Sequence, residues 1–191
     1  MLTGMHRTAG SRLSALRQAI MTDNDVEIAV RKQLLAQLAQ AGINIPVRAG
    51  FQSAKQGRED NFVMFFPAGE NPQGWQKRSY NPQGSDAGHL EAQQYETIFQ
   101  VQAFITEFSG YTAKDITAVV RMIVNSLPFT EALRKQGIGV QRATAIRLPY
   151  FVNDRGDYEQ NPSFDFNVTY TRTLRPETAA VTALYPDIHR I

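Results

Sequence analysis

The three histidines are the residues best suited to acid–base chemistry, and one of them has a carboxylate nearby. His6 and His189 lie close to the two ends of the sequence, whereas His89 follows Asp86 by three residues. A neighbouring carboxylate can orient an imidazole for base catalysis, but the reaction also needs a nucleophile, and no nucleophile pattern accompanies this pair. We therefore predict no catalytic residues, and a small hydrolase that uses His89 and Asp86 is the least favoured interpretation.

The sequence offers no ligand set for a metal ion or a nucleotide cofactor. The absence of cysteine excludes disulfides, thiolate catalysis and cysteine-ligated zinc, and no other residues stand at the spacing of a metal site. Residues 137–139 begin like a dinucleotide-binding loop, but Arg142 occupies the place of the third glycine. We predict no metal and no cofactor.

A cluster of aromatic and basic residues is the strongest candidate for an interaction site. It lies between two copies of Asn-Pro-Gln-Gly, at residues 71–74 and 81–84. Its members are Trp75, Lys77, Arg78 and Tyr80. Trp, Tyr and Arg are enriched in protein interfaces, and aromatic residues among cations can also stack on bases. A protein interface and a loop that packs its own tryptophan against the sheet explain the cluster equally well, and nucleic-acid binding explains it less well.

The N-terminal segment, residues 1–22, is basic and contains no acidic residue. Its arginines, Arg7, Arg12 and Arg17, are further candidates for contacts with phosphates. Such a composition also occurs in organelle transit peptides, but we interpret the segment as a basic arm before the first helix. No apolar run approaches the roughly 20 residues of a membrane span, so we expect no membrane association.

Length and composition indicate one ordinary globular domain with extended arms or loops. The chain has 191 residues, of which 42% are hydrophobic and 20% are charged. These values are typical of folded domains that can bury a core. Lys and Arg number 20 and Asp and Glu number 18, which leaves a formal charge of +2. That charge is too small to predict nucleic-acid binding by itself.

Helical periodicity predicts two main helices. Apolar residues repeat every three or four positions over residues 23–40, and Asp23 or Asn24 is the expected cap. A second helix is expected after Thr112, which begins a Thr-Ala-Lys-Asp capping box. Pro128 then ends this helix or begins another helical segment.

Alternating apolar and polar residues predict strands, most clearly at residues 164–174. The predicted strands are residues 43–51, 61–66, 95–105, 140–148 and 164–174. We expect residues 68–92 to form a polar insertion, with a turn at each Asn-Pro-Gln-Gly.

The resulting order, α-β-β-β-α-β-β, predicts an α+β fold, in which a mainly antiparallel sheet carries its helices on one face. We expect one domain at residues 23–175, followed by a C-terminal tail at 176–191.

Residues 112–174 resemble the tail-terminator or neck gateway proteins of tailed bacteriophages, especially those with contractile tails. The resemblance lies in the capped helix, the Leu-Pro-Phe sequence at 127–129, the strand at 140–148, the turn at 153–157 and the strand that follows. The order of the earlier helix and strands extends it to residues 23–175. It carries over no individual functional residue.

The resemblance implies a structural virion protein and not an enzyme. Such proteins form a homohexameric ring at the head–tail junction, which terminates the tail tube and connects it to the neck or collar. The implied partners are other copies of the chain, tail tube or sheath proteins, a neck, collar or connector protein, and genomic DNA that passes through the channel. The protein would be assembled in the host cytoplasm and remain in the virion. Another phage adaptor, such as a head-completion, collar or baseplate subunit, is the alternative.

Overall fold

The computed structural model describes residues 20–50, 61–83, 86–106, 108–152, 158–175 and 177–179. Their elements are α2 (Asp23–Gln40), β1 (Val47–Ala49), β2 (Asn61–Gln83), β3 (Asp86–Ile105), α3 (Ala113–Val124), α4 (Leu127–Arg134), β4 (Gly139–Val140), β5 (Tyr150–Val152), β6 (Tyr158–Gln160), β7 (Ser163–Leu174) and β8 (Glu177–Ala179). The chain divides into two compact units. The body comprises residues 22–73 and 95–170, and the hairpin unit comprises the described residues of 1–21, 74–94 and 171–191.

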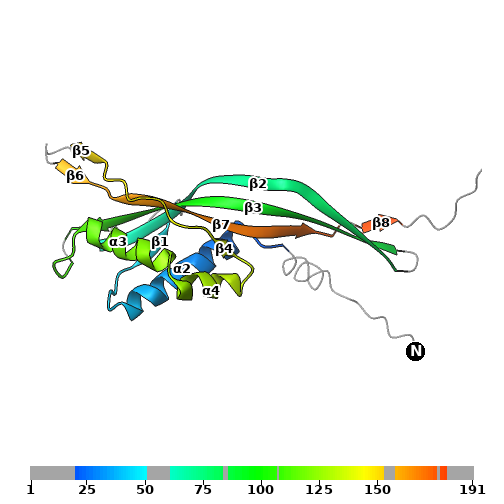
Figure 1. Cartoon of the computed structure of the whole chain (residues 1–191), viewed down its shortest axis with the longest axis horizontal. Helices are drawn as coiled ribbons and strands as arrows, with labels where there is room; N and C mark the ends of the chain where they lie inside the picture. The colour runs from blue at the N-terminus through cyan, green and yellow to red at the C-terminus, as the bar shows by residue number, and fades with distance from the viewer. Residues whose placement is uncertain are drawn as a thin grey trace, which may run out of the picture. The chain divides into compact units, whose positions relative to one another are not determined.

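The main sheet has the order β1-β2-β3-β7-β4, and β8 pairs with β3 beside this path (Figure 1). Only two residues separate β2 from β3 in the sequence, so these neighbouring strands run antiparallel. The β4–β7 and β3–β8 pairs are also antiparallel, whereas β1 and β2 are parallel. The predicted α+β fold with a mainly antiparallel sheet is therefore confirmed.

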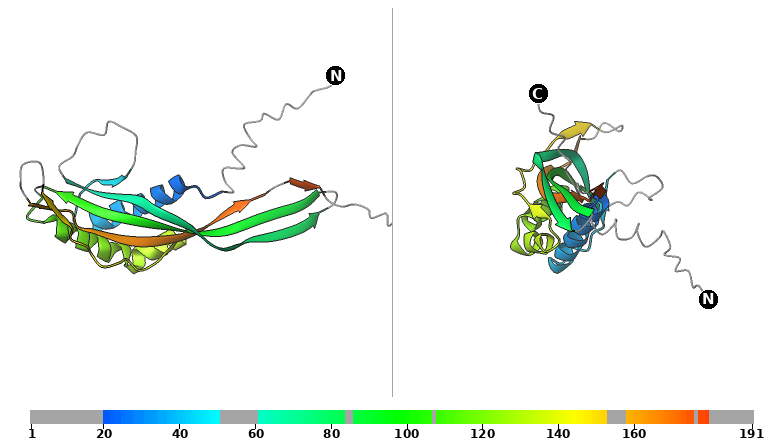
Figure 2. Two further views of the ribbon diagram at one scale, coloured as in Figure 1. Left: turned by 90° about the horizontal axis from the view of Figure 1, so that it is seen from above. Right: turned by 90° about the vertical axis from the view of Figure 1, so that its right-hand side faces the viewer.

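In the body, the three helices cover one face of the sheet (Figure 1 and Figure 2). The apolar face of β7, which the alternating sequence predicted, lies at the centre of this contact. Its side chains are all at most 2% exposed: Phe164, Phe166, Val168 and Tyr170. Strand side chains alternate between faces, so these four residues all point toward the helices. The helices contribute the buried faces of α2, α3 and α4 to the same core.

Phe166 lies at the meeting point of three other aromatic rings. Its centroid is 5.7 Å from that of Phe99 on β3, 6.4 Å from that of Phe164 and 6.5 Å from that of Phe129 on α4. The Phe129 ring meets it edge-on at 77°. Offset and edge-to-face aromatic pairs add favourable energy beyond the burial of their area. This cluster ties β3 and α4 to β7.

The first helix begins one residue before the expected caps. The N-cap is Thr22 and not Asp23 or Asn24. The Thr22 hydroxyl accepts the N–H of Asp25 at 3.2 Å, and the Asp25 carboxylate accepts the N–H of Thr22 at 2.9 Å. This reciprocal capping box satisfies two backbone donors at once.

The second predicted helix forms as α3 and α4. Thr112 and Asp115 make the expected capping box, and Ser126 caps α4, whose first turn contains Pro128. Gly137 adopts a φ of 78°, the left-handed conformation that glycine tolerates after a helix end. No single helix in the described residues has the length and composition of a membrane span, although α3 and α4 pass that test together with a bend of 53°.

The expected turn at residues 71–74 does not form, because β2 continues through it. The first proline of the two motifs, Pro72, is compatible with a strand that has a free edge. Gly74 has a φ of 65°, so the backbone is irregular there without ending the strand. The second motif lies at the end of β2, and residues 84–85 are outside the described part. Residues 68–92 thus belong to the long β2–β3 hairpin, whereas the sequence suggested a loop.

The other strands differ from expectation mainly at their ends. Strand β1 begins only after Pro46, and the predicted end at Phe51 is outside the described residues. Strands β5 and β6 form a separate two-stranded sheet on either side of the predicted turn at 153–157, which is also outside the described part. Strand β8 lies in the tail that we expected to be irregular.

The segment after β4 follows β7 without forming the regular strand predicted at 140–148. Its backbone N–H groups donate to a series of β7 carbonyls: Gln141 to Asn167, Thr144 to Asp165 and Arg147 to Ser163. The segment advances from residue 141 to 147 while β7 runs only from 167 to 163, so it holds two extra residues. Extra residues of this kind are β-bulges, which bend a strand and interrupt its ladder.

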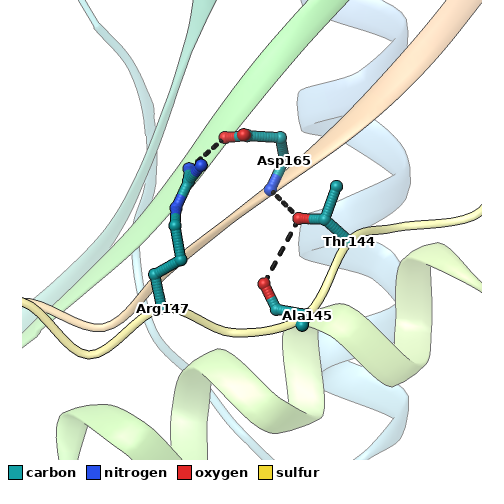
Figure 3. Close-up of polar contacts among 4 residues, drawn as sticks. All are labelled: Thr144, Ala145, Arg147 and Asp165. Carbon is teal, nitrogen blue, oxygen red and sulfur yellow. Dashed lines mark hydrogen bonds and ion pairs between the residues drawn. The ribbon is translucent and has the colours of Figure 1, made fainter.

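Side chains replace the missing ladder bonds in this segment (Figure 3). The Asp165 N–H donates to the Thr144 hydroxyl at 2.9 Å, and that hydroxyl lies 3.3 Å from the Ala145 carbonyl. The Arg147 guanidinium donates to the Asp165 carboxylate at 2.7 Å. These bonds hold the irregular segment against β7.

We expect Phe166→Ala to lower the free energy of unfolding by about 3–5 kcal/mol, because it leaves a cavity among three rings. Phe166→Leu should cost much less, since it keeps most of the buried volume. Leu174→Ala on the same strand is the control, because Leu174 is 50% exposed. Denaturant unfolding measures all three variants. Equal losses for Phe166→Ala and Leu174→Ala would contradict the central place of Phe166.

The two capping boxes predict a dependence of stability on pH. The hydroxyl and then the backbone N–H of Thr22 hold the pKa of Asp25 below its ordinary 3.8, and Thr112 does the same for the pKa of Asp115. A lowered pKa in the folded state stabilises the protein above pH 3.8, and this contribution is lost as the pH falls through the folded values. Asp25→Asn with Asp115→Asn should therefore destabilise the protein at neutral pH. In denaturant unfolding, this difference from the unmodified chain should shrink as the pH falls below 3.8; a constant difference would disprove the linkage.

Candidate assembly surfaces

In the hairpin unit, one face of the β2–β3 ribbon is held together by side-chain contacts between the two strands. The Tyr80 ring stacks on His89 with centroids 4.5 Å apart. The Arg78 guanidinium lies 3.3 Å from the Glu91 carboxylate, and the Gln76 amide donates to that carboxylate at 2.6 Å. Residues 76, 78 and 80 share a face because strand side chains alternate. Part of the predicted interaction cluster therefore stabilises the hairpin itself.

The opposite face of the ribbon presents Trp75 and Lys77. The Trp75 side chain is 99% exposed and Lys77 is also exposed. The alternative in which the tryptophan packs back on its own sheet is thus wrong for the chain as described. A fully exposed tryptophan is unusual, because such a side chain gains free energy when an interface covers it. The structure separates the four predicted residues into two faces, and a role for them in binding remains a prediction.

The edge of β2 that faces away from β3 is open over most of its length. β1 pairs only with Val63–Phe65, and beyond Phe65 no other described strand lies on that side. Residues 70–80 are exposed on both faces. An open edge presents unpaired backbone donors and acceptors, which can pair with a strand from another chain.

His89, the histidine of the predicted pair with Asp86, contacts other residues of the ribbon. His89 Nε2 lies 3.4 Å from the Glu91 carboxylate, and its ring is stacked on Tyr80. The backbone of Asp86 pairs with Ala179 of β8. His89 therefore takes part in the cross-strand contacts of the ribbon. Arg7, Arg12 and Arg17 lie outside the described residues.

A polar pocket of about 410 Å³ lies in the body between α2, β2, β3 and β7. The Tyr170 hydroxyl is 2.9 Å from both the Asp23 and the Glu70 carboxylates and 3.3 Å from the Thr97 hydroxyl. Burial first, and then these two carboxylates, raise the pKa of Tyr170 well above its ordinary value. Burial, followed by the charge of Asp23, also raises the pKa of Glu27 at the pocket wall.

The Tyr170 hydroxyl connects β7 to α2, β2 and β3 at this pocket. Within the described residues, no group of His, Asp or Glu has the arrangement of a metal site. Sequence patterns did not single out these residues, because Asp23 read as a helix cap and Tyr170 as one more apolar residue of β7. The pocket thus acts as a structural tie in the body.

The uncovered face of the body's sheet is a further exposed surface. Phe62 and Phe104 stack there with centroids 4.9 Å apart, and the Arg48 guanidinium lies 5.3 Å from the Phe62 ring centre. All three side chains are half-buried. This contact explains why Phe104 interrupts the polar face of its strand.

Trp75 is the only tryptophan in the sequence, so tryptophan fluorescence reports on the exposed face of the β2–β3 ribbon alone. We expect the single chain, free of any partner, to show red-shifted tryptophan emission that a soluble quencher suppresses completely, because the indole is surrounded by water. Free tryptophan amide and the unfolded chain are the references. A blue-shifted emission that resists the quencher in the dissociated chain would show that the ribbon is covered.

Comparison with known proteins finds a matching family and a similar fold. A family model described as E217 gateway protein gp29 matches residues 25–180. Among solved structures, the PVC sheath/tube terminator of an extracellular contractile injection system, in its extended state, has a similar fold with a TM-score of 0.55 and 13% identity. The similarity covers 90% of this chain and 65% of that one, so this chain spans less than two thirds of the terminator. No curated protein matches the sequence.

Proposed function

Because the chain belongs to the family of E217 gateway protein gp29, a family of phage tail and neck proteins, we propose that it is a structural protein that terminates the tail tube and joins it to the neck. The observation that carries this proposal is the family match over residues 25–180, which includes nearly the whole body and the ribbon of the hairpin unit. The terminator fold of the body supports it.

We propose further that the chain acts as a homohexameric ring whose channel passes genomic DNA. A ring requires a heterologous interface, in which one surface of a subunit contacts a different surface of the next. The open edge of β2 and the exposed Trp75 supply one such surface. Tail tube or sheath proteins on one side and a neck, collar or connector protein on the other are the partners that this position requires. Virion localisation after assembly in the host cytoplasm follows from the same role.

Electron microscopy of phage particles and native mass spectrometry of the purified chain test this function. We expect a ring of identical subunits, located between the tail tube and the head. A ring at the baseplate or collar would favour another adaptor role. A chain that stays monomeric and is absent from particles would disprove the proposal.

We expect Trp75→Ala to weaken ring assembly without affecting the fold. Interface tryptophans often contribute about 2 kcal/mol or more, which corresponds to an assembly affinity lower by about 30-fold or more. The free energy of unfolding of the dissociated chain should change by less than about 0.5 kcal/mol, as for other exposed positions.

Met122→Ala is the matched control, because Met122 is 70% exposed on α3, which belongs to the body and not to the ribbon. Sedimentation velocity measures assembly of both variants. If both variants assemble as tightly as the unmodified chain, Trp75 has no part in the ring interface.

A further inference from the structure

The pairing of β8 shows where the described part of the tail reaches the end of β3. β8 runs antiparallel to β3, and its last residue, Ala179, pairs with Asp86. Asp86 is also the first residue of β3, and only the two residues of the connection to β2 precede it. After Ala179, β3 therefore has no strand residue left to pair with the chain.

The sequence that follows has the composition of a strand. Residues 177–185 lie between Pro176 and Pro186 and contain no proline. The last six of them, Ala-Val-Thr-Ala-Leu-Tyr at 180–185, carry no charge and include three residues that favour strands. Short uncharged segments of this kind add readily to an open sheet edge. This segment therefore fits an open strand edge, and β3 has no further residue to pair with it.

The open edge of β2 is long enough to hold this segment. Residues 73–81 contain no proline and lie between Pro72 and Pro82, so every residue there retains its backbone N–H. The prolines at both ends limit the addition of another strand to residues 73–81. Trp75 and Tyr80 are 99% and 60% exposed within it. An added strand would cover apolar surface and also satisfy the free backbone groups.

We propose that residues 180–185 of one subunit pair with residues 73–81 of β2 in a neighbouring copy of this chain. This contact rests on the proposed ring and specifies which segments of neighbouring subunits meet in it. Because β8 ends opposite the first residue of β3, the acceptor in this proposal is the β2 edge of another subunit. β-Strand addition provides main-chain hydrogen bonds, and the exposed aromatic side chains determine where the strand docks.

Cysteine crosslinking tests this contact, because the natural chain has no cysteine and so gives no background. Thr182→Cys is made in one preparation, and Lys77→Cys or Ser79→Cys in another. The two preparations are mixed, assembled into rings and oxidised. A disulfide between them requires β-carbons about 4 Å apart and can form only between different chains. We expect peptide mass spectrometry to find position 182 linked to position 77 or 79.

Lys135→Cys is the control acceptor, because Lys135 is exposed at the end of α4, which belongs to the body and not to the ribbon. It should give no link with Thr182→Cys. Ala183→Pro in the full-length chain is the second test, because proline removes one backbone donor and restricts a paired strand. We expect this variant to fold and to lose ring stability.

The outcomes separate this contact from the ring itself. Rings that form with no crosslink at positions 77 and 79, and that tolerate Ala183→Pro, would overturn the contact and leave the ring in place. Protection of β2 amides from hydrogen exchange only after a tube or sheath protein is added would assign the edge to that partner instead. A monomeric unmodified chain would overturn both proposals.

Discussion

The burial of one face of β7 is the contact on which the rest of the body depends. Phe166 brings together β3, β7 and α4 through aromatic rings, and the remaining helices complete the same layer. Cores of this kind are packed as densely as organic crystals, so each of these elements restricts the position of the others. The capped helices and the polar pocket around Tyr170 then fix the ends of the layer. These contacts therefore hold the elements of the body in one arrangement.

Sequence patterns predicted the parts of the fold that local chemistry determines. The 3.6-residue and two-residue periodicities located α2, α3, β3 and β7, because burial on one face requires these spacings. The capping box at Thr112 could also be predicted, because its two partners stand three positions apart in the sequence. The family resemblance was also confirmed, since it depended on the order of these elements.

The errors arose where distant contacts overrule local preference. The Asn-Pro-Gln-Gly repeat favours turns by itself, but pairing with β3 keeps residues 71–74 extended along an open edge. The regular strand expected after Val140 is interrupted because two extra residues have to be accommodated beside β7. The cluster around Trp75 was found from composition, yet its division into two faces depends on the strand pairing. The Tyr170 pocket left no signal, because its residues are distant in the sequence.

The two edges of the main sheet are not equivalent. On the β4 side, the Thr144 carbonyl of the bulged segment accepts from the Arg121 guanidinium, and its Ala143 N–H donates to the Asn125 side chain, which leaves no continuous row for another strand. On the β2 side, the described strands leave the row open beyond Phe65. A second sheet can therefore extend this one at the β2 edge and not at the β4 edge, so the bulges beside β7 restrict edge-to-edge pairing to one side of the subunit.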